Sequence, residues 1–387
     1  MSKASIDAVQ ALRGIAALAV VFWHASRYLG PYGSGIGGLV FAPGAAMGVD
    51  LFFLISGFIM FHTKRNSDGS WRAFADFAIK RAARIWPVWI IALICYLLLR
   101  IDASYFTDPV KLGWLAHSLL LIPTAGAPSD VPPVYGVPVL GVGWTLNYEM
   151  YFYAFFGLAM LCGRWRWPAF VAWLVATLVL IPLATGRLDQ ASGAWIILEP
   201  SNGYAFANRY LGLMTNGLIL LFAAGVAIGA IYHSRWAIAN VLLLRILAVA
   251  AVGAVLLQYA LHFHVWHGIG HWGLSLTPLL LVVLMLHKSE NIRLPRWLIY
   301  LGDISFSLYL LHPTIQEGFD VVLGGVLPNF LRTGFTALIV TTLLSILAAA
   351  ASYHILERGL CEYVRRRLRH WVLGKPDDTA VALPKPA

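Results

Sequence analysis

Two residues in the first apolar run of the chain have the types and the spacing for anion binding and proton transfer. Arg13 and His24 are eleven residues apart in an otherwise apolar stretch. At about 100° per residue, this spacing brings both side chains to one face of a helix, and at about 1.5 Å per residue it separates them by about 16 Å. The arginine suits an anion near the start of the helix, and the histidine suits a general base near its end.

Three more ionisable residues lie inside long apolar runs. Asp50 comes about six residues into the second run, Glu149 about seven residues into the fourth, and His312 a few residues before the end of the ninth. If the runs cross a membrane in alternate directions, these three side chains reach the depth of His24. Two histidines and two carboxylates at one depth would supply a general base and a partner that orients it.

Each of these residues also has a structural interpretation. Arg13 can extend to the polar headgroups, His24 can satisfy helix packing, and Asp50 can cap a helix end. Glu149 is harder to explain in this way, because an unpaired carboxylate in an apolar run is costly. An ionisable residue inside a membrane span costs about 2.5–3.5 kcal/mol, so the shared depth of these residues favours a functional site.

A second pair of arginines precedes the third apolar run. Arg81 and Arg84 are three residues apart, which places them on one helical face, and Lys80 adjoins them. Guanidinium groups in this arrangement suit a phosphate-bearing anion. The alternative is an ordinary basic cluster that anchors the chain at a membrane surface.

A metal site is not expected. The histidines between the seventh and eighth runs have no carboxylate or cysteine nearby in the sequence, so an interfacial belt of histidines and aromatic residues explains them better. The cysteines are too few and too scattered for a zinc site or a disulfide framework. These residues are His262, His264, His267 and His271, and Cys95, Cys162 and Cys361.

The composition identifies the elements that would position these side chains. Of the 387 residues, 59% are hydrophobic and only 12% are charged, about half of the roughly 25% charged residues of a soluble domain. We therefore predict an all-α, polytopic membrane protein rather than a soluble enzyme. About 20 apolar residues are needed for one span. Ten runs meet this need, at about 9–28, 44–63, 85–101, 142–162, 168–186, 210–232, 239–261, 271–287, 298–316 and 334–356.

The distribution of basic residues predicts the orientation of these ten spans. With the N-terminus in the cytoplasm, 22 of the 28 Lys and Arg residues fall on the cytoplasmic side and six fall outside, as the positive-inside rule requires. Both termini are then cytoplasmic, and the net charge of +10 reflects orientation rather than nucleic-acid binding. We predict a membrane domain over 1–372 and a disordered cytoplasmic tail over 373–387.

The chain resembles the membrane acyltransferase type three family over about 5–360. Within that family it is most similar to bacterial exopolysaccharide O-acetyltransferases of the succinoglycan kind. The family's pattern departs at one place, where Gly359 follows GluArg instead of the usual Pro. The segments that carry the resemblance are the Arg-to-His signature 13–24, GlyValAspLeuPhePheLeuIleSerGlyPhe 48–58, ArgAlaAlaArg 81–84, GlyTrpThrLeuAsnTyrGluMetTyrPheTyr 143–153, GlyAspIleSerPheSerLeuTyrLeuLeuHisPro 302–313 and TyrHisIleLeuGluArg 353–358.

This resemblance implies that an acyl group, usually acetyl, passes from acyl-CoA to a hydroxyl of an exopolysaccharide or its lipid-linked precursor. Acetyl-CoA would be a donor substrate, and no bound cofactor is expected. The resemblance implies catalytic roles for His24, Glu149 and Asp50. His24 would be the general base or, as a lesser alternative, a transient acyl carrier. Donor binding is implied for Arg13, Arg81 and Arg84, and a supporting role for Ser56, Trp144 and His312.

The expected setting is the bacterial inner membrane, with membrane lipid and the polysaccharide biosynthesis machinery as further partners. A transporter or flippase for a sugar or lipid is the main alternative function. That class favours internal repeats, and none is evident in the sequence. A non-catalytic partner of a polysaccharide polymerase is a second alternative, and it would need none of the ionisable residues.

Overall fold

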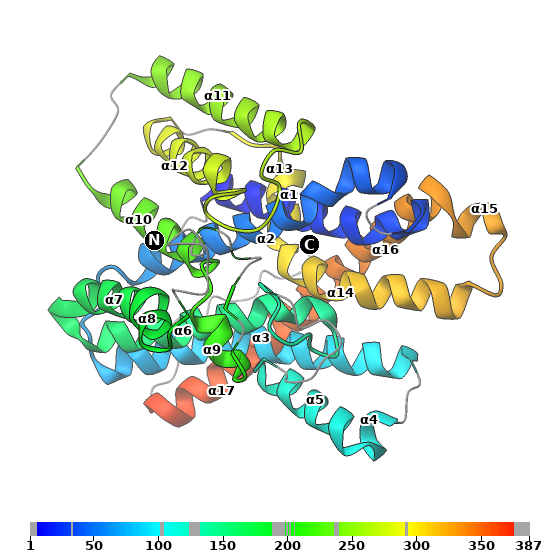
Figure 1. Cartoon of the computed structure of the whole chain (residues 1–387), viewed down its shortest axis with the longest axis horizontal. Helices are drawn as coiled ribbons and strands as arrows, with labels where there is room; N and C mark the ends of the chain where they lie inside the picture. The colour runs from blue at the N-terminus through cyan, green and yellow to red at the C-terminus, as the bar shows by residue number, and fades with distance from the viewer. Residues whose placement is uncertain are drawn as a thin grey trace, which may run out of the picture.

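The computed structural model describes residues 6–31, 34–100, 104–123, 132–187, 198, 200, 203–204, 206–235, 240–290 and 293–374. Every regular element within these residues is helical (Figure 1), so the prediction of an all-α membrane protein is confirmed. Seven helices in this part of the chain are long and apolar enough to cross a membrane, and an eighth is added if a bent pair counts as one span.

The helices are named in chain order. They are α1 (Asp7–Ala25), η1 (Ser26–Leu29), α2 (Gly35–Lys64), α3 (Trp71–Arg100), α4 (Ser104–Thr107), α5 (Pro109–Leu120), η2 (Gly141–Gly143), α6 (Trp144–Leu161), η3 (Gly163–Trp165), α7 (Arg166–Val175), η4 (Ala176–Leu180), α8 (Ile181–Ala184), α9 (Arg209–Met214), α10 (Ile219–His233), α11 (Val241–Ala260), α12 (Gly273–Ser289), α13 (Arg296–Asp303), α14 (Ser305–Gly318), η7 (Phe319–Leu323), α15 (Asn329–Arg332), α16 (Gly334–Ser352), η8 (Tyr353–Leu360) and α17 (Cys361–Leu373).

Three of the ten predicted runs differ from simple spans. The run 142–162 forms α6, of 18 residues, and 271–287 forms α12, of only 17 residues. The run 298–316 is broken between α13 and α14, which meet at a bend of 67°. The count of ten spans and the cytoplasmic termini therefore stay predictions. The predicted tail 373–387 lies outside the described residues beyond Gly374, and the domain boundary at 372 is untested.

Two helices begin well before the apolar runs that predicted them. Helix α2 starts at Gly35 rather than near 44, and α3 starts at Trp71 rather than near 85. A 30-residue helix is about 45 Å long, longer than the roughly 30 Å hydrocarbon core. Arg81 and Arg84 therefore lie within α3 rather than before it, and Asp50 lies in the middle of α2 rather than near its start. Helical propensity continues past the apolar window, which is why hydropathy alone placed these starts too late.

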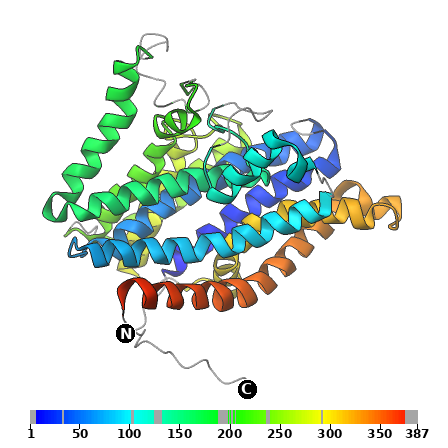
Figure 2. The ribbon, with the colours of Figure 1, turned by 90° about the horizontal axis from the view of Figure 1, so that it is seen from below.

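The extra length of α3 is packed against the end of the chain. Helices α3 and α17 run side by side in opposite directions (Figure 2). Asp76 of α3 accepts from Lys80 at 2.7 Å, and its other carboxylate oxygen lies 3.0 Å from Nε of Arg369 on α17. These ion pairs and the helix contact hold the first half of α3, with Arg81 and Arg84, in a fixed position.

Helix α1 packs against α2, α13, α14 and α16. Two glycines let its neighbours reach its backbone. A Cβ at Gly48 of α2 would overlap the carbonyl oxygen of Ala16, and a Cβ at Gly302 of α13 would overlap the carbonyl oxygen of Gln10. The position of α1, which carries Arg13 and His24, is therefore set by direct backbone contact on two sides.

Gly302→Ala should lower the stability of the folded protein. The added methyl group forces α13 away from α1, and overpacking of this kind costs about 1–3 kcal/mol. The measurement is the unfolding midpoint of detergent-purified protein, followed by circular dichroism.

Gly253→Ala in α11 is the matched control. Among the described residues, no atom beyond the local backbone of α11 lies within 4 Å of a Cβ built at Gly253, and alanine favours a helix by about 1 kcal/mol over glycine. A midpoint for Gly302→Ala at or above that of Gly253→Ala would contradict the packing argument.

Candidate active site

A cavity of about 270 Å³ lies between α1, α2, α3, α6 and α14. It contains all three arginines that the sequence analysis singled out, because α1 and α3 present them to the same space. Two other predicted site residues, Ser56 and Glu149, also line it. The polar lining residues are Gln10, Arg13, Ser56, Arg81, Arg84, Thr145, Glu149, Tyr153 and Tyr309.

The arginines are held mainly by neutral groups. The guanidinium of Arg81 lies 5.0 Å from the centre of the Tyr153 ring, and that of Arg84 lies 5.7 Å from the centre of the Phe306 ring. Nη1 of Arg13 donates to Oε1 of Gln10 at 3.0 Å. Cation–π contacts and an amide supply no full counter-charge. The residues that line the cavity include three guanidinium groups and one carboxylate, that of Glu149, and Glu357 also attracts Arg13 from outside this lining. The remaining excess of positive charge suits an anion.

Glu149 belongs to this cavity rather than to a layer with the histidines. Its carboxylate accepts a hydrogen bond from the hydroxyl of Tyr153, one helical turn further along α6. Tyr153 thus contacts both Glu149 and Arg81. The sequence analysis did not single out Tyr153 or Gln10, although each lies one helical turn from a residue that it did single out, Glu149 and Arg13 respectively.

The two predicted histidines lie together beyond the cavity. The ring centres of His24 on α1 and His312 on α14 are 5.0 Å apart, and His312 is fully buried. Nδ1 of His312 lies 3.2 Å from the carbonyl oxygen of Leu308. A neutral His312 that donates from Nδ1 carries its lone pair on Nε2, and Nε2 has no hydrogen-bond partner among the described residues.

Tyr309 separates the cavity from these histidines. Its side chain lines the cavity, its ring centre is 6.1 Å from that of His312, and its hydroxyl is hydrogen-bonded to Thr145 Oγ1 at 2.8 Å. Neither His24 nor His312 lines the cavity. The side chain of Tyr309 therefore lies between this end of the cavity and His312.

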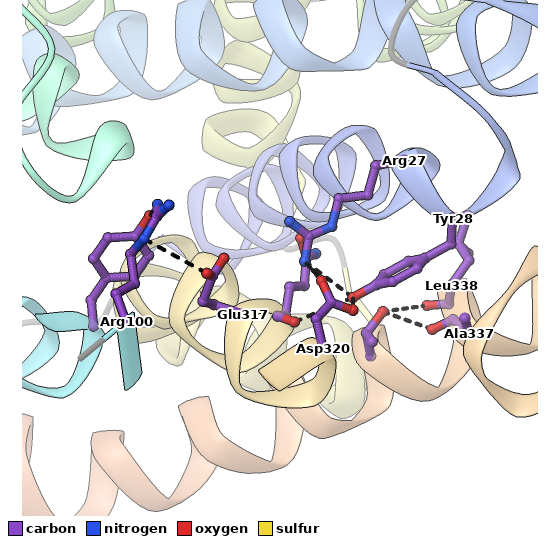
Figure 3. A network of polar contacts seen from close by, with 10 residues as sticks. Arg27, Tyr28, Arg100, Glu317, Asp320, Ala337 and Leu338 are labelled. Atoms are coloured by element: carbon purple, nitrogen blue, oxygen red, sulfur yellow. Dashed lines mark hydrogen bonds and ion pairs between the residues drawn. The ribbon is translucent and has the colours of Figure 1, made fainter. Parts of the chain in front are cut away.

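A polar network beyond the histidines ties the ends of α1 and α14 together (Figure 3). Nη2 of Arg27 lies 2.5 Å from Asp320, and the hydroxyl of Tyr28 donates to the other oxygen of Asp320 at 3.0 Å. Arg27 is three residues after His24, and Asp320 is eight after His312. The network thus links η1 to η7, the segments that directly follow the helices carrying His24 and His312.

Asp50 has a different partner from the one that the sequence suggested. It is fully buried, Oδ1 lies 2.8 Å from Nδ1 of His267, and Oδ2 accepts from the backbone N–H of Gly268 at 2.7 Å. His267 lies in the segment between α11 and α12, and the Trp144 ring packs edge-on against it at 5.5 Å. The sequence analysis assigned His267 to an interfacial belt with no carboxylate nearby, and the structure instead gives it a buried carboxylate partner.

The predicted layer of four ionisable residues is thus divided among three places. His24 and His312 pair, Glu149 lines the arginine cavity, and Asp50 binds His267. The depths were counted from the ends of apolar runs, and the earlier start of α2 moved Asp50 inward. The catalytic roles of these residues stay predictions. Within the described ranges, no cluster of three His, Cys, Asp or Glu residues is arranged to hold a metal ion.

Comparison with known proteins gives a consistent result. The model of the acyltransferase domain family matches residues 6–353. The chain is 32% identical over 345 residues to the exopolysaccharide production protein ExoZ of Rhizobium meliloti (strain 1021), covering 84% of this chain and 92% of that protein. It is 28% identical over 236 residues to nodulation protein 10 of Rhizobium leguminosarum bv. viciae, covering 57% and 59%. No solved structure gives a significant match.

Asp50→Ala should destabilise the protein by removing the acceptor of two buried donors. An unsatisfied buried donor costs about 1–3 kcal/mol, so the unfolding midpoint in detergent should fall clearly. Asp68→Ala is the control, because Asp68 is exposed and binds only its neighbour Ser70 among the described residues. Equal midpoints for the two variants would show that the contact with His267 and Gly268 contributes nothing.

Proposed function

Because the chain belongs to the membrane acyltransferase 3 family, and is therefore a multi-pass O-acyltransferase, we propose that it transfers an acetyl group from acetyl-CoA to a sugar hydroxyl. The acceptor would be an exopolysaccharide or its lipid-linked precursor. The observation that carries the proposal is the cavity in which Arg13, Arg81 and Arg84 converge beside a histidine pair.

The choice of acceptor rests on the relative from Rhizobium meliloti. Its name assigns it to exopolysaccharide production, and the similarity covers 92% of its length. A carbohydrate presents many hydroxyl groups, which are the nucleophiles that an O-acyltransferase needs. The bacterial inner membrane is the proposed location, with the start of α1 on the cytoplasmic side, where the basic residues are concentrated and acyl-CoA is made.

The cavity has the charge for the donor. Coenzyme A carries phosphate groups, and arginine binds phosphate through paired N–H donors. A volume of about 270 Å³ is at the lower end of the range for small-molecule sites, roughly 300–1,000 Å³. It would hold part of the donor, with Arg81 and Arg84 on its phosphates and Arg13 further along the arm. Ser56 and the Glu149–Tyr153 pair complete the polar lining around the arm.

The histidine pair has the chemistry for the acceptor. His24 would accept the hydroxyl proton as the oxygen attacks the thioester carbonyl, and the coenzyme A thiol would leave with a proton. The ring of His312, held by the Leu308 carbonyl, would orient His24. Asp50 would act indirectly. By binding His267 and Gly268 it would hold the His267 ring against the ring of Trp144. For the transfer to occur, the donor arm must pass the side chain of Tyr309.

His24→Ala should abolish acetyl transfer while leaving the amount of protein in the membrane unchanged. Loss of a general base reduces the rate by about 10²–10⁴-fold. Transfer is measured from radiolabelled acetyl-CoA into polysaccharide in membrane vesicles, and by the O-acetyl signals in the NMR spectrum of the host's polysaccharide.

His354→Ala is the control for this variant, because His354 is exposed on η8 and contacts Tyr300 and Tyr353. Full transfer by His24→Ala would reject the general-base role. If polysaccharide export fails and acetylation of the remaining polymer is normal, the transporter or flippase alternative is supported instead.

Arg81→Ala and Arg84→Ala should each raise KM for acetyl-CoA with little change in kcat. A hydrogen bond to a charged group contributes about 1.5–3 kcal/mol, which corresponds to roughly tenfold or more in KM. Arg72→Ala is the matched control on the same helix, since Arg72 is exposed and binds the carbonyl of Leu373. An unchanged KM in both cavity variants would exclude these arginines from donor binding.

A further inference from the structure

Arg13 is the end of a hydrogen-bonded chain that begins outside the cavity. Nη1 of Arg13 donates to Oε1 of Gln10 at 3.0 Å, and Nε2 of Gln10 donates to Oδ1 of Asp303 at 2.5 Å. Gln10 and Arg13 line the cavity, whereas Asp303 does not. Asp303 is the last residue of α13, at the 67° bend before α14.

The chemistry of the three groups fixes the direction of this chain. A guanidinium only donates hydrogen bonds, a carboxylate only accepts them, and an amide has one accepting and one donating end. With Asp303 on one side, the amide of Gln10 must turn its NH2 toward the carboxylate and its oxygen toward Arg13. Without Asp303 the amide can rotate, and an NH2 facing the guanidinium would repel it.

Backbone packing places Asp303 within reach of Gln10. A Cβ at Gly302 would overlap the carbonyl oxygen of Gln10, and a Cβ at Gly14 would lie 3.0 Å from the backbone nitrogen of Gly302. The two helices therefore meet at glycines on both sides. The contact between Asp303 and Gln10 follows directly from this crossing of α13 and α1.

We propose that Asp303 is a positioning residue that sets the orientation of Arg13 through Gln10, and thereby the affinity of the cavity for the donor. This inference rests on the proposed function, because it takes the anion in the cavity to be coenzyme A. It assigns a role in donor binding to the GlyAsp pair that opens the segment 302–313.

The direction in which loss of Asp303 changes the affinity for coenzyme A distinguishes a positioning role from a purely electrostatic one. Asp303 is negatively charged, so its removal would strengthen binding of an anion if only its charge mattered. The hydrogen-bonded chain from Asp303 through Gln10 to Arg13, called the relay below, requires weaker binding instead, since loss of Asp303 releases Gln10 and with it Arg13. Asp303→Ala should therefore weaken binding of coenzyme A, by about tenfold for the loss of one charge-assisted hydrogen bond.

The experiment measures the dissociation constant of coenzyme A for the detergent-purified full-length chain, which needs no acceptor. The variants are Asp303→Ala, Gln10→Met, which keeps the side-chain length, and the double variant. Because the relay runs through Gln10, the double variant should bind no more weakly than the weaker of the two single variants. The control is Asp7→Ala, which removes an acidic residue at the N-terminal end of α1 and should leave the affinity for coenzyme A unchanged.

Two further variants make each outcome decisive. Asp303→Asn keeps an acceptor oxygen for Gln10 and should bind coenzyme A more tightly than Asp303→Ala. Arg13→Ala separates the two proposals, because an unchanged affinity in this variant rejects the donor site itself. The role of Asp303 is rejected if Arg13→Ala weakens binding of coenzyme A but Asp303→Ala strengthens it or leaves it unchanged. It is also rejected if the fold-changes in affinity of Asp303→Ala and Gln10→Met multiply in the double variant.

Should Asp303→Ala fail to fold, as judged by its unfolding midpoint, Gln10→Met tests the same chain without altering α13. Affinity equal to the wild type in that variant overturns the proposal, and weakened affinity supports it.

Discussion

The close approach of α1 to its neighbours at glycine is the constraint on which the rest of the structure depends. Gly48 brings the backbone of α2 against Ala16, and Gly302 brings that of α13 against Gln10. Between helices in lipid the hydrophobic effect gives no driving force, so close packing contributes strongly to helix association, and small residues permit it. Since α1 carries both Arg13 and His24, its position determines where the arginine cavity and the histidine pair can form.

The charged side chains of the membrane domain fall into two groups. Some are paired with groups of the protein, and others contact mainly neutral groups. Asp50 is fully buried and binds His267 and Gly268. Asp76 is surrounded by basic groups. The arginines of the cavity rest instead on aromatic rings and an amide. Buried positive charge that exceeds its counter-charges is costly, so this arrangement favours an anion in the cavity.

Much of this organisation was predictable, because hydrophobic length and helical spacing are local properties. The all-helical architecture, the family and the convergence of Arg13 with Arg81 and Arg84 follow from runs and motifs that a single sequence displays. The starts of α2 and α3 were missed because helices continue through less apolar residues. The partner of Asp50 was missed because His267 is 217 residues away, and no local pattern reports a contact of that range.

The wall formed by Tyr309 and Thr145 has a consequence for the membrane as a permeability barrier. A continuous polar path from the arginine cavity to the histidines would let water file through, and imidazoles along such a path would conduct protons. The two side chains are buried and joined by a hydrogen bond of 2.8 Å, so an aromatic ring stands between the cavity and His312. If the proposed donor and acceptor reach the protein from opposite faces of the membrane, such a closure would limit the leakage of ions through it.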